Sequence, residues 1–98
     1  MMDECKKVGI FCRNVSYGER AKEELDKGDG TQFIIFPIND GEILGAQRVD
    51  KAYVLDDVSY REILYLVQPC LKDRDGCIMI GDGNTWMNLS VILKLINI

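Results

Sequence analysis

Histidine is absent from this chain of 98 residues, and proline and tryptophan are few. Without histidine there is no zinc finger built on cysteine and histidine, no Ser-His-Asp triad and no imidazole general base. The 12 lysine and arginine residues are outnumbered by 16 aspartate and glutamate residues, which gives a net charge of -4. This balance argues against binding of nucleic acid by bulk charge. No run reaches the ~20 apolar residues of a membrane span, so we expect no membrane contact.

The four cysteines, Cys5, Cys12, Cys70 and Cys77, do not have the CxxC spacing of a zinc or redox motif. Cys12 and Cys77 fall in apolar runs, which is typical of reduced cysteines in a core. The segment 1–7 is polar and leads into no long apolar stretch, so no signal peptide is recognisable. We therefore expect a soluble, cytoplasmic protein.

The hydrophobic fraction of 47% and charged fraction of 29% are those of an ordinary globular domain, and we expect one domain over residues 1–98. Four short apolar runs rich in β-branched and aromatic residues predict strands: Val8–Cys12, Phe33–Ile38, Ala52–Leu55 and Cys77–Ile80. Pro37 cannot donate to a ladder, so its strand is expected to be an edge there or to end there.

Two helices are predicted between these strands. Ser16 and Ser59 each have a glutamate three residues later, the spacing of a capping box, so the helices should begin near Tyr17 and Tyr60. Pro69 should end or kink the second helix.

The order of these elements favours a small Rossmann-like, three-layer α/β domain with a mainly parallel sheet of four or five strands and two main helices. The apolar tail 89–98 fits either a last strand or a short helix.

Acidic residues follow two of the predicted strands, where open α/β sheets bind ligands. Asp56 and Asp57 follow one strand and Asp82 follows the next. If the two strands are neighbours, these carboxylates lie close together and suit a hard cation such as Mg2+, with Asp56 and Asp57 as its ligands. The alternative is structural: Asp57 or Ser59 helps to cap the next helix, and Asp82 lies in a glycine-rich turn.

The segment after Asp82 adds further polar groups. Gly81 and Gly83, which flank Asp82, let backbone N–H groups cradle an anion, although these glycines suit a turn with positive φ equally well. Trp86, the only tryptophan, either stacks on a ligand or partner or covers the edge of the core. The predicted ligand-binding residues are Asp56, Asp57, Asp82, Asn84, Thr85 and Trp86.

Three segments resemble part of a P-loop NTPase core, of the kind found in phage terminase large subunits and related helicases. Ala52–Asp57, with four apolar residues and then an acidic pair, resembles a Walker B strand. Gly76–Ile80 and the polar residues after it resemble the motif III strand, and Ile10–Asn14 resembles the strand that follows the phosphate loop. The resemblance covers residues 8–86.

This resemblance implies that Asp56 binds Mg2+, that Asp57 stands where the family has its catalytic glutamate, and that Asn84 or Thr85 is the polar sensor. No GK[ST] sequence of a Walker A motif occurs. The resemblance therefore implies a relative kept for binding rather than for ATP hydrolysis.

We expect a small non-catalytic protein-interaction or regulatory module, of a kind that a phage or mobile element encodes. Apolar residues of the C-terminal segment exceed what one short element usually buries, which predicts an interface with a protein partner or a homodimer through that segment. The alternative is a nucleotide-binding or Mg2+-dependent phosphoryl-processing domain that uses Asp56, Asp57 and Asp82. No catalytic residue and no cofactor are assigned, and Mg2+ is the one candidate that the acidic residues leave open.

Overall fold

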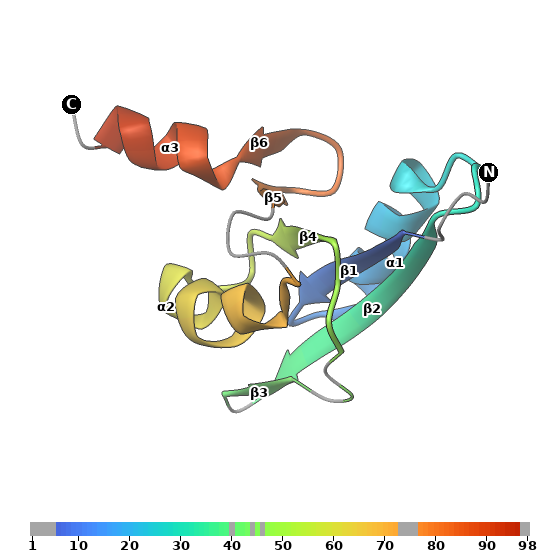
Figure 1. The fold of residues 1–98 in the computed structure, drawn as a ribbon, viewed down its shortest axis with the longest axis horizontal. Helices are drawn as coiled ribbons and strands as arrows, with labels where there is room; N and C mark the ends of the chain where they lie inside the picture. The colour runs from blue at the N-terminus through green and yellow to red at the C-terminus, as the bar shows by residue number, and fades with distance from the viewer. Residues whose placement is uncertain (1–5, 40, 44, 46, 73–76, 97–98) are drawn as a thin grey trace.

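The computed structural model describes residues 6–39, 41–43, 45, 47–72 and 77–96, and Cys5 and Ile98 lie outside these ranges. Its six strands form one sheet in the order β3-β2-β1-β4-β5-β6 (Figure 1). The strands are β1 (Lys7–Cys12), β2 (Gln32–Asn39), β3 (Glu42–Ile43), β4 (Lys51–Leu55), β5 (Cys77–Gly81) and β6 (Trp86–Asn88). The helices are α1 (Val15–Leu25), α2 (Tyr60–Glu62) and α3 (Leu89–Ile96).

The α/β class predicted from the sequence is confirmed, but the strand count is wrong. The four inner strands, β2, β1, β4 and β5, are parallel, and the edge strands β3 and β6 are antiparallel to their neighbours. Both edge strands return by short connections, and each has only two or three residues. The sheet is therefore mixed and has six strands rather than four or five.

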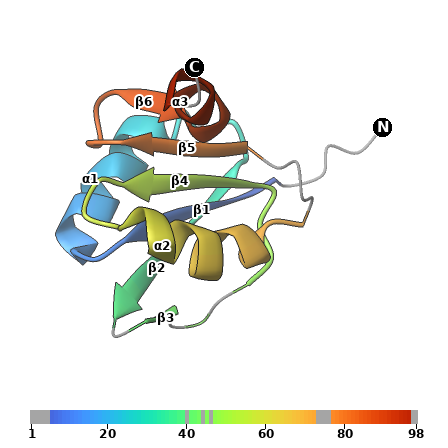
Figure 2. The ribbon, with the colours of Figure 1, turned by 90° about the vertical axis from the view of Figure 1, so that its left-hand side faces the viewer.

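Helices cover both faces of the sheet, with α1 behind it and α2 in front of it in Figure 2. Successive strand residues point to opposite faces, so β1 sends Phe11 toward the α2 side and Ile10 and Cys12 toward the α1 side. All three side chains are fully buried. This explains why the central strand is a continuous apolar run rather than an alternating one.

The start of α1 differs from the prediction. Asn14, not Ser16, is its N-cap, because the Asn14 side chain accepts a hydrogen bond from the Ser16 backbone N–H at 2.9 Å. The capping box at the start of α2 is confirmed: Ser59 Oγ accepts from the Glu62 N–H, and the Glu62 carboxylate accepts from the Ser59 N–H.

The second helix changes its winding before Pro69, as expected for a residue without an N–H. After α2 the chain continues as a π-helical turn over Ile63–Val67 and a 3-10 turn over Gln68–Cys70. Ile63 and Val67 remain buried on the sheet. The sequence left open whether the apolar tail is a strand or a short helix, and in the structure it forms the helix α3. No helix among the described residues is long and apolar enough to cross a bilayer.

Candidate functional site

At the carboxyl ends of β1 and β4, the two crossover connections of the sheet leave in opposite directions. From β1 the chain passes through α1 to β2 on one side, and from β4 it passes through α2 to β5 on the other. Open α/β sheets bind ligands at such a point. Here the surface has an open depression of about 600 Å³, lined by Arg13, Asn14, Val15, Tyr17 and Asp57.

Asp57 lines this depression and accepts hydrogen bonds from the backbone that leads into α1. Its two carboxylate oxygens each accept from the Arg13 N–H at 3.1 Å, and one accepts from the Asn14 N–H at 2.9 Å. Free N–H groups before a helix are a common anion site. These two already have an anionic partner from the protein itself, so Asp57 ties the end of β4 to the end of β1.

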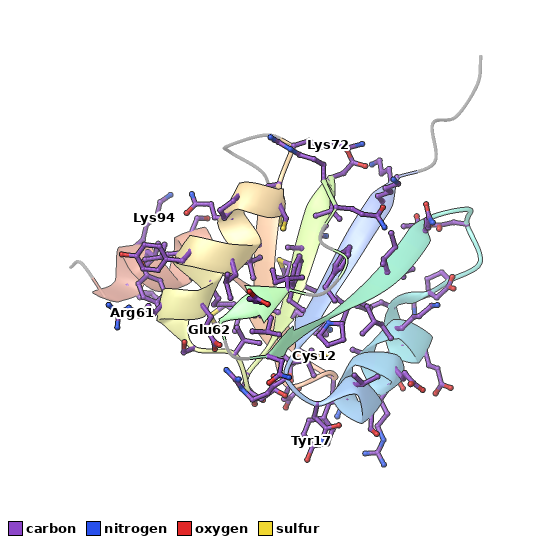
Figure 3. All side chains as sticks on the ribbon, turned by 90° about the horizontal axis from the view of Figure 1, so that it is seen from below. Cys12, Tyr17, Arg61, Glu62, Lys72 and Lys94 are labelled. Atoms are coloured by element: carbon purple, nitrogen blue, oxygen red, sulfur yellow. The ribbon has the colours of Figure 1, made fainter. Side chains whose placement is uncertain are left out.

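Arg13 extends the contact to α2. Its guanidinium binds both oxygens of Glu62, at 2.5 and 2.6 Å, and its Nε donates to the Asp57 carbonyl at 3.3 Å. The Ser59 N–H and then the Arg13 guanidinium hold the pKa of the Glu62 carboxyl below its ordinary value. Figure 3 places Glu62, Cys12 and Tyr17 at this end of the sheet and Lys72 at the opposite end.

Replacing Glu62 with glutamine should destabilise the fold by about 1 kcal/mol at neutral pH, since it weakens a helix cap and removes a half-exposed ion pair. The folded pKa is lowered, so the stabilisation by Glu62 is complete above its ordinary pKa and is lost as the pH falls through the folded value. Urea unfolding of wild type and Glu62→Gln should therefore differ at neutral pH and converge in acid. Glu23→Gln on the exposed side of α1 is the matched control, and an equal loss there would contradict the account.

The acidic residues predicted as a metal site follow neighbouring strands, but they do not share a cluster. Leu55 of β4 is in register with Gly81 of β5, so Asp56 and Asp82 follow at adjacent strand ends. Asp56 is exposed, whereas Asp57 turns to Arg13 and Asn14. In the described ranges no three Asp, Glu, Cys or His side chains form a group suited to a metal. The Mg2+ site on Asp56 and Asp57 stays a prediction.

Asp82 closes its own loop. One carboxylate oxygen accepts from the N–H groups of Asn84 and Thr85, at 2.9 and 3.0 Å, and from the Thr85 hydroxyl at 3.3 Å. The Thr85 N–H contributes most to holding the Asp82 pKa below its ordinary value. A Cβ on Gly81 would lie 1.9 Å from the Thr85 carbonyl oxygen, so glycine is required by this close approach. The structure thus uses most of these polar groups to form the β5–β6 connection.

Trp86 lies on β6 and packs against the core on the α1 side. Its ring meets the Tyr53 ring edge to face, with centroids 4.9 Å apart. Of the two alternatives for Trp86, this geometry favours the one in which it covers the core edge, although the side chain remains partly exposed.

Three cysteines are described, and all are free thiols. Cys12 and Cys70 are buried and Cys77 is half-buried. Burial raises the pKa of the Cys12 thiol to about 11, with a further contribution from the Asp57 charge. A thiol that stays protonated is a poor nucleophile, so Cys12 has the properties of a core residue.

A second surface carries apolar rather than polar groups. We call it the α3 surface and define it as Val91 and Leu95, which are 47% and 62% exposed. Val91 and Leu95 are four residues apart on one face of α3. Figure 1 shows α3 extending beyond the edge of the sheet.

The other face of α3 anchors it to the body of the protein. Leu89 is buried in the core on the α2 side, and Leu93 packs against that core. Asn88 accepts from the N–H and hydroxyl of Ser90, at 2.9 and 2.7 Å, and so fixes the start of the helix. The helix is therefore held by one side while its apolar outer side stays in solvent.

No protein-family model, no curated protein and no solved structure matches this chain. These comparisons leave the resemblance to a P-loop NTPase core untested.

Proposed function

We propose that this chain is a small non-catalytic protein-interaction module that binds its partner through the α3 surface. The observation that carries the proposal is the exposure of Val91 and Leu95 on a helix whose opposite side is anchored. Apolar groups of this size gain free energy when a partner removes them from water, and clusters of them on a surface are typical of interaction sites.

The partner that fits this surface is a protein with an apolar groove and an acidic rim. Lys94 is the only charged residue in α3, and it is exposed one turn along the helix from Val91, beside the apolar stripe. A facing carboxylate would fix the orientation of the complex, and the apolar contacts would supply most of the affinity. The cytoplasmic location and the phage or mobile-element origin expected from the sequence belong to this proposal.

Photo-crosslinking tests the surface without removing it. Benzoylphenylalanine replaces Leu95 in one variant and the exposed Glu23 of α1 in a control, and both are irradiated in cells of the source organism. We expect a discrete adduct from position 95 that is absent from position 23, and the captured protein, once purified, should bind the wild-type chain. Equal labelling at both positions would contradict the proposal. An adduct of twice the chain mass would assign the surface to the homodimer instead.

The second candidate is the nucleotide-binding or Mg2+-dependent domain. One observation favours it. The open depression lies at the carboxyl ends of β1 and β4, where the two crossover connections leave in opposite directions and a Rossmann-like fold would bind a nucleotide. A thermal-shift series with nucleotides, with and without Mg2+, tests it. A metal-dependent rise in melting temperature that Asp56→Asn abolishes would support it, and a flat response would remove it.

A further inference from the structure

Among the described residues, no strand pairs with the outer edge of β2 along most of its length. β2 has eight residues and pairs with β1 from Gln32 to Pro37, but β3 pairs with it only at Ile38 and Asn39. Figure 1 shows the long arrow of β2 on the outside of the sheet, with the short β3 beside its end.

The backbone groups that point outward can be assigned from one hydrogen bond. The Gln32 N–H donates to the Lys6 carbonyl at 2.8 Å, so Gln32 faces β1. Because backbone groups alternate along a strand that pairs in parallel, Phe33 and Ile35 face away from β1. Within the described ranges neither outward N–H donates a hydrogen bond to another backbone group. Pro37 also faces outward, which explains how a residue without an N–H is accommodated there.

This edge lacks the features with which proteins usually block edge pairing. Such edges are kept short, carry charges, or are bent by bulges. β3 and β6 are short, whereas β2 contains no charged residue over QFIIFPIN. The one protective residue, Pro37, lies close to the end that β3 already covers. The N-terminal part of β2 is thus an uncharged template for another strand.

We propose that the edge of β2 binds a second copy of this chain, so that β2 pairs with β2 in antiparallel orientation and one sheet runs through both copies. Each copy carries a net charge of -4, so self-association is favoured only at a segment that brings no charged side chains together. β2 offers such a segment, and a two-fold axis makes each hydrogen bond twice.

The position of the axis follows from β3. Since β3 occupies the outer edge at Ile38 and Asn39, the two strands overlap through their N-terminal halves, with the axis near Phe33. If the two-fold axis is perpendicular to the sheet, the α1 helices of both copies lie on the same face of the joined sheet. Phe33 and Ile35, which pack toward the α1 side, then continue one apolar layer across the contact.

The experiment compares molar mass by light scattering over a series of concentrations. The wild type should reach twice 11.1 kDa. A synthetic chain with an N-methyl group on the Ile35 amide keeps every side chain and loses the outward donor. It should stay at the monomer mass and have the melting temperature that the wild type shows at concentrations where it is monomeric. Gln32→Lys, which charges the exposed start of the edge, should weaken the dimer at least tenfold, whereas Gln68→Lys, with the same change in charge, should not.

Amide exchange gives a second measurement at the level of single residues. In the dimer the N–H groups of Phe33 and Ile35 should exchange slowly, and in Gln32→Lys they should exchange fast, whereas Ile34, which faces β1, should stay protected in both. A wild type that is monomeric at every concentration would overturn the proposal, as would an N-methylated chain that dimerises normally. A dimer that Leu95→Asp dissociates and Gln32→Lys does not would move the contact to the α3 surface.

Discussion

Replacing Gly81 with alanine should separate β6 from β5 and cost about 2–4 kcal/mol of stability. An added Cβ at this position would lie 1.9 Å from the Thr85 carbonyl oxygen and 2.8 Å from the Trp86 ring. The oxygen belongs to the backbone, so it cannot rotate away as a flexible side chain would. The chain must therefore open the β5–β6 connection, and the contact between Trp86 and Tyr53 opens with it.

The loss should be measured by thermal unfolding together with the fluorescence of Trp86, the only tryptophan. Gly28→Ala is the matched control. Gly28 has a φ of 74° and nothing near its missing Cβ, so its replacement strains the backbone without a collision and should cost about 1 kcal/mol. If Gly81→Ala costs no more than Gly28→Ala, the close approach does not constrain the loop.

Phe11→Ala should destabilise the protein by about 3–5 kcal/mol, the largest effect we expect from a single side chain. The Phe11 ring is fully buried in the central strand and stacks on Phe36 with centroids 5.2 Å apart. Gly9 leaves the space for both rings, since its missing Cβ would lie 2.7 Å from Phe11. Truncation would leave a cavity between the Phe36 ring and the α2 side of the core.

Urea unfolding checks this expectation, and Tyr65→Ala supplies the control. Tyr65 is 69% exposed, so losing its ring should change stability by less than about 0.5 kcal/mol. A small loss at Phe11 would mean that the core closes around the cavity. A large loss at Tyr65 would mean that the exposed ring has a contact that its exposure does not suggest.

Features set by neighbouring residues could be predicted from the sequence. The apolar runs that form β1, β2, β4 and β5 were recognisable because buried parallel strands need continuous apolar residues. The capping box of Ser59 and Glu62 is a contact over three residues, so its spacing is visible in the chain.

The start of α1 and the strand β6 could not be predicted from the sequence. At α1 two capping residues competed, and at β6 no pattern was present. Ser16 has the capping-box spacing, yet Asn14 caps α1 because β1 ends at Cys12 and the helix begins two residues earlier than that spacing predicts. β6 has only three residues and no alternation, so it carries no sequence signal of its own. Its position depends on the close β5–β6 connection at Gly81.

The candidate site could be predicted only as far as the strand ends. The sequence left the strand order open, and the pairing of β4 with β5 puts Asp56 and Asp82 at neighbouring strand ends. The orientation of each carboxylate was decided by nearby N–H groups instead. For Asp57 those groups lie 44 and 43 residues away, on Arg13 and Asn14, and a contact of that separation leaves no periodic trace in the sequence.

In the C-terminal helix α3, one part of the prediction is confirmed and another part of the helix serves the core. Its excess of apolar residues predicted an exposed patch, and Val91 and Leu95 are exposed. Leu89 is nevertheless buried and Leu93 packs against the core, so removing the whole segment would also remove part of that core. Single substitutions on the outer side of α3 therefore separate binding from folding better than truncation does.

The most direct test of the proposed function is the affinity of the partner captured at position 95 for wild type and for Leu95→Asp, measured by calorimetry. Leu95 is 62% exposed in the free chain, so the substitution should leave the melting temperature almost unchanged. We predict that binding weakens at least thirtyfold, by about 2 kcal/mol, as for an apolar residue at the centre of an interface. Equal affinities for both chains would contradict the proposal that the α3 surface is the binding site.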